Sequence, residues 1–206
     1  MNEVRLNKVL VALNAILPLG LLGYDALRGQ LGANPIEFFL RTTGVLTLIF
    51  LIITLAITPL RKLFRWNSVI KYRRMLGLFA FFYGVLHLTT YSVFDKGLDL
   101  KLIGVDVIQR PFIALGMTAF LMLIPLAVTS TNGWIKRLGG KRWARLHMLI
   151  YPIAILGVIH FWMIVKSDVF YPAIFASILA SLLAYRFVPK RKAGMDTGRP
   201  TKLPQI

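Results

Sequence analysis

The 206-residue chain contains no cysteine, only three histidines, and eight acidic residues against 25 basic ones. Without cysteine it forms no disulfide, no cysteine-ligated iron–sulfur cluster and no C-x-x-C-H attachment for c-type haem. It also lacks G-x-G-x-x-G and G-x-x-x-x-G-K-S/T motifs, and no segment outside its apolar runs is long enough for a nucleotide-binding domain. Any haem is therefore held non-covalently, and any electron donor and acceptor are separate molecules.

Long uncharged runs dominate what is present. Hydrophobic residues make up 57 % of the chain and charged residues 16 %. The uncharged runs are residues 9–24, 42–60, 75–94, 111–135, 146–165 and 169–185. A helix needs about 20 mostly apolar residues to cross a bilayer. We therefore expect an all-α integral membrane protein, a six-transmembrane-helix bundle over residues 1–188, followed by a basic, disordered tail at 189–206. The alternative for the first run is a cleaved secretory signal.

The basic residues are distributed unevenly between the two sides of such a bundle. Nineteen of the 25 lie in residues 1–8, 61–74, 132–145 and from 186 onward. The six on the opposite side are Arg28, Arg41, Lys96, Lys101, Arg110 and Lys166. Lys and Arg accumulate on the cytoplasmic side of membrane proteins, so both termini are expected to be cytoplasmic. The net charge of +17 then reflects topology. We expect no nucleic-acid partner, because no soluble basic module is present.

All three histidines lie inside or at the mouth of apolar runs, where an ionisable side chain is costly and usually functional. At about 1.5 Å of rise per residue, His87 lies roughly 18 Å and His160 roughly 21 Å from the cytoplasmic edge. Imidazoles from facing membrane helices are suitable axial ligands for a b-type haem. We therefore expect His87 and His160 to ligate a haem b near the outer leaflet. His147, at the cytoplasmic mouth, would serve an inner haem or the site where a donor delivers electrons.

The rotational relation between His147 and His160 is less favourable. Thirteen residues at about 100° each put the two side chains roughly 140° out of phase on an ideal helix. Pro152 lies between them, and a kink there could turn both rings toward one face. The plainer alternative is that each histidine only hydrogen-bonds a neighbouring helix.

Residues on the third apolar run could assist a cofactor. Arg73 and Arg74 could neutralise a haem propionate, although basic residues flanking a cytoplasmic helix end are common without any such role. Gly77 and Gly84 would allow a flat macrocycle, or simply another helix, to approach closely.

Two segments resemble a known family. Residues 73–78 (Arg-Arg-Met-Leu-Gly-Leu) and 86–91 (Leu-His-Leu-Thr-Thr-Tyr) are similar to the R-R-x-L-G-L and L-H-L-T-S-Y signatures of the bacterial MsrQ (YedZ) family. That family belongs to the wider ferric-reductase-like transmembrane group. Residues 129–131, 143–147, 151 and 159–160 continue the similarity, which is collinear from about Leu31 to Lys166.

The resemblance implies a multi-pass, haem-binding subunit of the bacterial inner membrane. It also implies a periplasmic molybdopterin-dependent methionine-sulfoxide reductase as partner, which repairs oxidised proteins. Electrons would come from the quinone pool or a cytosolic flavin reductase, and an FMN is implied as a further cofactor. His87, His147 and His160 match the family histidines. One departure is visible: where the family has H-x-x-G-R, this chain reads Arg41-Thr-Thr-Gly-Val.

These observations favour an electron-transfer subunit with one haem b, or two, over a catalytic subunit. A small proton-coupled transporter is the alternative from another class. It would require acidic residues within the spans, and residues 75–94 and 146–165 contain none. A stand-alone ferric or quinone reductase remains compatible with the residues.

Overall fold

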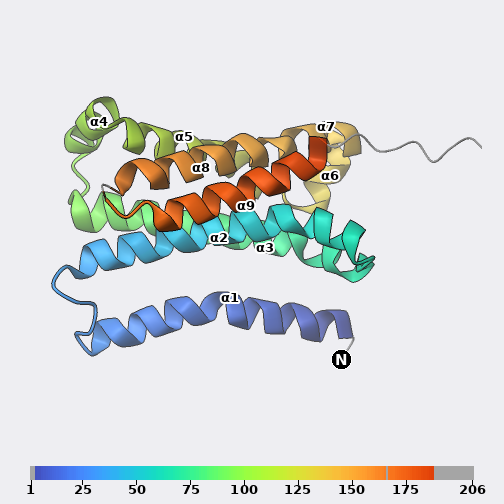
Figure 1. Ribbon diagram of the computed structural model, residues 1–206, viewed down its shortest axis with the longest axis horizontal. Coiled ribbons are helices and arrows are strands. Elements are labelled where there is room, and N and C mark those ends of the chain that lie inside the picture. The colour runs from blue at the N-terminus through green and yellow to red at the C-terminus, as the bar shows by residue number, and fades with distance from the viewer. Residues whose placement is uncertain (1–2, 166, 188–206) are drawn as a thin grey trace, which may run out of the picture.

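The computed structural model describes residues 3–165 and 167–187, and within them every regular element is a helix. Lys166 and the tail expected at 189–206 lie outside the described residues. The long helices run side by side as a bundle (Figure 1). They are α1 (Glu3–Leu27), α2 (Pro35–Leu63), α3 (Arg73–Thr89), α5 (Pro111–Val128), α8 (Ile150–Ile164) and α9 (Phe170–Phe187).

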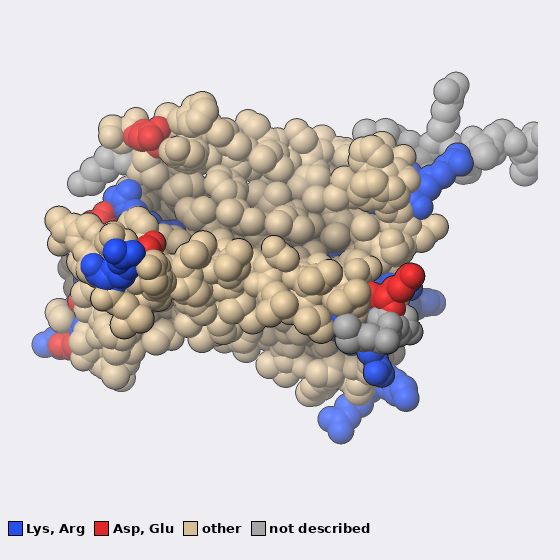
Figure 2. Space-filling model, turned by 90° about the horizontal axis from the view of Figure 1, so that it is seen from below, with Lys and Arg blue, Asp and Glu red and all other residues tan. Residues whose placement is uncertain are grey.

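Five apolar helical segments have the length and composition of a membrane span. The sixth, the apolar part of α9 at Phe170–Arg186, is somewhat shorter. Charged side chains gather toward the two ends of the bundle, with an uncharged surface between them (Figure 2). The predicted all-α, multi-span membrane bundle is thereby confirmed.

The described chain starts and finishes at the same end of the bundle (Figure 1). We call this the inner end; it also carries α6 (Asn132–Leu138) and α7 (Gly140–Leu146). The opposite, outer end carries α4 (Leu100–Gln109). An even number of crossings requires this arrangement, whereas the assignment of the inner end to the cytoplasm stays a prediction.

One predicted span was too long. The run at 111–135 forms a helix only as far as Val128, after which the Thr129 and Ser130 hydroxyls donate to the carbonyls of Pro125 and Leu126. Thr131 then caps a new helix, α6, by accepting from the Trp134 backbone N–H. Hydropathy alone could not locate this break, because the hydroxyl groups that end one helix and start the next are uncharged.

The third and fifth spans depart from regular α-helix near their histidines. After α3 the chain continues as a π-helical segment, Thr90–Asp95. Between α7 and α8 lies a 3₁₀ turn at His147–Leu149. The irregularity in the fifth span is therefore at this turn rather than at Pro152. That proline falls in the first turn of α8, where its missing N–H leaves no hydrogen bond unmade.

The closest packing in the bundle is within two helix pairs, α2 with α3 and α5 with α8. The first helix is peripheral: Ala15 and Leu22 are its buried residues, and most of its apolar side chains are exposed. It is tied to α3 by the Tyr83 hydroxyl, which donates to the Ala15 carbonyl at 2.6 Å. The two packed pairs therefore form the rigid part of the fold.

An ionic network holds α4 on the outer end. Asp106 of α4 is buried, accepts a hydrogen bond from the Tyr91 hydroxyl at 2.9 Å, and pairs with Lys96 at 2.9 Å and Arg110 at 3.3 Å. The hydrogen bond from Lys96, above all, lowers the pKa of Asp106, and the same bond raises the pKa of Lys96. The connection between the third and fourth spans thus contains an anchored helix.

The directions of these two pKa shifts determine how the contribution of the network to stability depends on pH. A carboxyl whose pKa is lowered by folding contributes stability above its unfolded pKa and loses it as the pH falls through the folded value. A lysine whose pKa is raised loses its contribution only as the pH rises through that higher value. Stability from this network should therefore be constant from about pH 5 to pH 9 and decline on either side.

Replacing Asp106 by Asn should lower the free energy of unfolding by about 2 kcal/mol, because Lys96 is left without its buried counter-charge. The variant should also lose less stability than wild type as the pH is lowered. Thermal unfolding in detergent between about pH 3 and pH 10 measures both effects. The matched control is Glu37→Gln, which breaks the exposed Glu37–Arg41 pair and should cost about 0.5 kcal/mol or less. Equal losses in the two variants would contradict the role of the network.

Candidate functional site

His87, on α3, is fixed by the neighbouring helix α2. Its Nδ1 lies 2.9 Å from the Leu40 carbonyl oxygen. A carbonyl can only accept a hydrogen bond, so Nδ1 carries the ring proton and Nε2 keeps a free lone pair. The hydrogen bond therefore selects one tautomer and presents Nε2 as a ligand.

His160, on α8, is held in the same way by α5. Its Nδ1 lies 2.5 Å from the Phe112 carbonyl oxygen. Here again the proton is on Nδ1 and the lone pair on Nε2. Each of the two packed helix pairs thus holds one imidazole in the same protonation state.

A glycine lies four residues after each of these carbonyls. A Cβ on Gly44 would lie 2.9 Å from Cε1 of His87, and a Cβ on Gly116 would lie 2.8 Å from Cε1 of His160. In an α-helix the carbonyl of residue i accepts the N–H of residue i+4, so these glycines sit beside the oxygens that the rings must reach. Only glycine leaves the room for each ring to reach the second lone pair of its carbonyl.

The two rings face each other across the bundle. Their centroids are 6.1 Å apart and their planes are at 89°. An imidazole nitrogen binds a metal at about 2 Å, so a metal between two such rings requires centroids about 6 Å apart. The separation of the rings, their common protonation state and the two glycine cradles fit a bis-imidazole metal centre. Within the described residues no group of three or more His, Cys, Asp or Glu side chains comes together as an alternative metal site.

His147 is not brought to this pair; it lies at the inner end. Its Nδ1 is 3.1 Å from the Trp143 carbonyl, and its ring stacks on the Trp143 indole with centroids 3.9 Å apart. The indole N–H in turn donates to the Thr129 carbonyl at 2.9 Å. Nε2 of His147 is buried and has no hydrogen-bond partner among the described residues. His147 is therefore oriented by a tryptophan and lies apart from the other two imidazoles.

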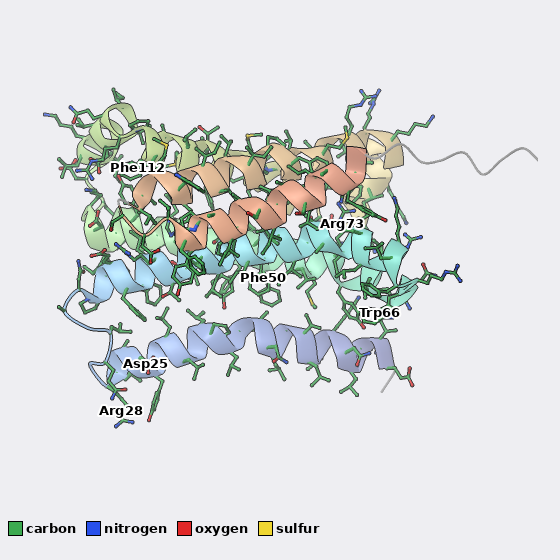
Figure 3. The ribbon with its side chains drawn as sticks, viewed as in Figure 1. Asp25, Arg28, Phe50, Trp66, Arg73 and Phe112 are labelled. Atoms are coloured by element: carbon green, nitrogen blue, oxygen red, sulfur yellow. The ribbon has the colours of Figure 1, made fainter. Side chains whose placement is uncertain are left out.

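The two candidate arginines have different surroundings. Arg74 is exposed and donates to the Asn132 side chain at 2.8 Å, which links α3 to α6. Arg73 is half-buried at the inner end, opposite the end that holds Phe112 (Figure 3). Its charge acts on His147. Of the two, only Arg73 is half-buried.

The sequence alone did not reveal several residues that contact these histidines. Gly77 and Gly84 were singled out, yet a Cβ on Gly77 would come no closer than 3.8 Å to Thr54, and one on Gly84 would touch Phe120 at 3.4 Å. Both distances are ordinary helix packing. The glycines that contact histidine rings are Gly44 and Gly116. In the sequence, the only indication of this role was that each lies in an apolar run adjacent to one that carries a histidine.

Arg186 was also missed as a site residue. It reaches from α9 to the Tyr151 hydroxyl, and its guanidinium lies over the Tyr151 ring at 4.8 Å. In the sequence it looked like one more basic residue flanking a span. Arg41, at the position where the family has a histidine, is exposed and pairs with Glu37 at 2.6 Å.

The relatives found among known proteins agree with one another. The family model described as "Ferric reductase like transmembrane component" matches residues 43–158. The chain is similar to the protein-methionine-sulfoxide reductase heme-binding subunit MsrQ of Herminiimonas arsenicoxydans, with 54 % identity over 89 % of this chain and 85 % of that protein. It is 50 % identical to the protein of the same name from Rhodospirillum rubrum, over 92 % and 93 % of the two chains. No solved structure matches.

The glycine cradles give a direct test of the geometry. Gly44→Ala and Gly116→Ala should each displace a histidine ring from its carbonyl, at a cost of about 1–3 kcal/mol for overpacking. Gly77→Ala is the matched control, since its new Cβ has only ordinary contacts. Thermal unfolding of the three variants measures the difference. Equal stability of Gly116→Ala and Gly77→Ala would show that the ring does not lie against α5.

Proposed function

The chain belongs to the MsrQ family of the ferric-reductase-like transmembrane proteins, and on that premise we propose that it is a b-type haem electron-transfer subunit of a methionine-sulfoxide reductase system. The haem would be held by His87 and His160. The observation that supports this most strongly is the 6.1 Å separation of two imidazoles whose Nδ1 atoms are both tied to carbonyls. The multi-pass bundle would lie in the bacterial inner membrane.

Haem supplies reversible one-electron chemistry at iron, which none of the 20 amino-acid side chains offers at comparable potentials. The chain lacks cysteine, so attachment is through the histidines alone. The carbonyls of Leu40 and Phe112 orient the two rings and increase their basicity as ligands. Both rings are half-buried between the pairs α2–α3 and α5–α8, where a haem would cover their Nε2 atoms.

Position within the bundle supports a direction for electron flow. His87 and His160 lie toward the outer end, whereas His147 lies at the inner end. A donor at the inner face, the quinone pool or a cytosolic flavin reductase, would deliver electrons at the His147 region, which would hold an inner haem or receive the donor. The acceptor would be a periplasmic molybdopterin-dependent subunit. Reduction of one methionine sulfoxide takes two electrons and two protons and releases water, and oxidation of one quinol supplies both.

An FMN is a further proposed cofactor, on family grounds. The competing transporter hypothesis gains no support, because α3 and α8, both fully described, contain no carboxylate for a proton relay. No observation favours a stand-alone ferric or quinone reductase over a subunit that delivers electrons to a partner.

The ligand assignment predicts distinct spectra for the three histidine variants. His87→Ala and His160→Ala should each abolish the six-coordinate, low-spin signature of a bis-imidazole haem, because each removes one of its two ligands. His147→Ala is the matched control and should keep that signature. Absorption and electron paramagnetic resonance spectra of detergent-purified protein, oxidised and dithionite-reduced, measure the outcome. A low-spin signature that survives in His160→Ala would sink the assignment.

Electron delivery can be tested separately from haem binding. Proteoliposomes that contain the chain and its periplasmic partner should reduce methionine sulfoxide with quinol as donor, and His160→Ala should lower that rate by at least about 100-fold. The partner supplied directly with a reduced viologen should be unaffected by the variant. Quinol-driven reduction at the wild-type rate in His160→Ala would show that electrons bypass this pair.

A further inference from the structure

The guanidinium of Arg186 is incompletely satisfied. One nitrogen, Nη1, donates to the Tyr151 hydroxyl, while Nη2 is buried and has no hydrogen-bond partner in the described parts of the chain. An arginine that only anchors a helix end would extend its charge toward water or lipid headgroups. Arg186 instead turns inward, over the face of Tyr151. A buried N–H without a partner is costly and needs an explanation.

The electrostatic surroundings make the cost larger. The charge of Arg73 acts on Arg186 and repels it. The ion pairs between described residues lie at the start of α2 and around α4, which are at the outer end (Figure 1). Neither Arg73 nor Arg186 is paired with a carboxylate of the described chain. Partly buried cations without a counter-charge are unfavourable unless an anion joins them.

A second unpartnered atom lies in the same region. His147 and Tyr151 lie four residues apart in the fifth span, and both are at its inner end. Nε2 of His147 is buried and free, as is Nη2 of Arg186. Arg73 acts electrostatically on both residues. The inner end thus combines two buried nitrogen atoms without a hydrogen-bond partner among the described residues, one on an imidazole and one on a guanidinium.

We propose that Arg186, together with the Tyr151 hydroxyl, forms a binding site for the carboxylate or phosphate of a molecule held at the inner end, the end that also carries Arg73 and His147. This rests on the proposed function only for the identity of that molecule. A guanidinium offers parallel N–H donors that match both oxyanions, which a lysine does not. Three sources carry such a group: a second haem through its propionates, a flavin mononucleotide through its phosphate, and an anionic phospholipid through its headgroup.

The test compares wild type with Arg186→Gln, Arg186→Lys and Arg142→Gln, all purified in the same detergent. Arg142 is an exposed residue of α7 at the same end, so Arg142→Gln removes the same charge without touching the site. Haem per polypeptide is measured by the pyridine haemochromogen, flavin by fluorescence after acid release, and phospholipid by extraction and mass spectrometry. The low-spin spectrum of the His87–His160 pair reports whether each variant is folded.

Arg186→Gln should bind the inner group about tenfold more weakly, so that one of the three contents falls while the low-spin spectrum is kept. The content that falls identifies the source. Arg142→Gln should match wild type, and Arg186→Lys should show a smaller loss. Wild-type contents of all three in Arg186→Gln would overturn the inference. If Arg186→Gln fails to fold, undiminished contents in Arg186→Lys overturn it instead.

The result is separable from the proposed function. A wild-type protein without a low-spin bis-imidazole haem would refute the function. The anion site would still be judged by the flavin and phospholipid contents of the Arg186 variants.

Discussion

The hydrogen bond from each imidazole Nδ1 to a carbonyl on the adjacent helix is the interaction on which the rest of the structure depends. A helix carbonyl is normally screened by the side chain one turn further along. Gly44 and Gly116 remove that screen at Leu40 and Phe112, so each ring reaches an oxygen that already serves its own helix. The same contact sets the tautomer, the ring orientation and the helix spacing. A side chain larger than that of glycine at position 44 or 116 would push the histidine ring away from the carbonyl.

This constraint explains the division of the bundle into two packed pairs. The pair α2–α3 holds one ring and the pair α5–α8 holds the other. A group bound by both rings links the two pairs, so its binding energy contributes to the stability of the whole bundle. α1, attached through Tyr83, needs no such precision and stays peripheral. The winding of the third span changes just beyond His87, where α3 is followed by the π-helical segment Thr90–Asp95.

The two ends of the bundle treat charge in opposite ways. At the outer end Asp106 is surrounded by Lys96, Arg110 and the Tyr91 hydroxyl, so α4 is anchored by a nearly neutral network. At the inner end Arg73 and Arg186 have no such partner in the described chain. Topology accounts for an excess of cations on that side, but not for burying an unpaired one. The charges of the outer network are balanced within the protein, whereas the cations of the inner end have no counter-charge among the described residues, which is why we propose an anion there.

The sequence by itself determined the properties that depend on local composition and on distance along the chain. Uncharged runs of about 20 residues specify the spans, and the rise per residue placed His87 and His160 at matching depths. The end of α5 at Val128, the 3₁₀ turn at His147–Leu149 and the inward turn of Arg186 were decided by tertiary structure. So were the contacts of the two histidines, which join residues 47 and 48 positions apart. The physical reason is that hydropathy records whether a residue tolerates lipid, while the direction in which a side chain points is settled by the helix that packs against it.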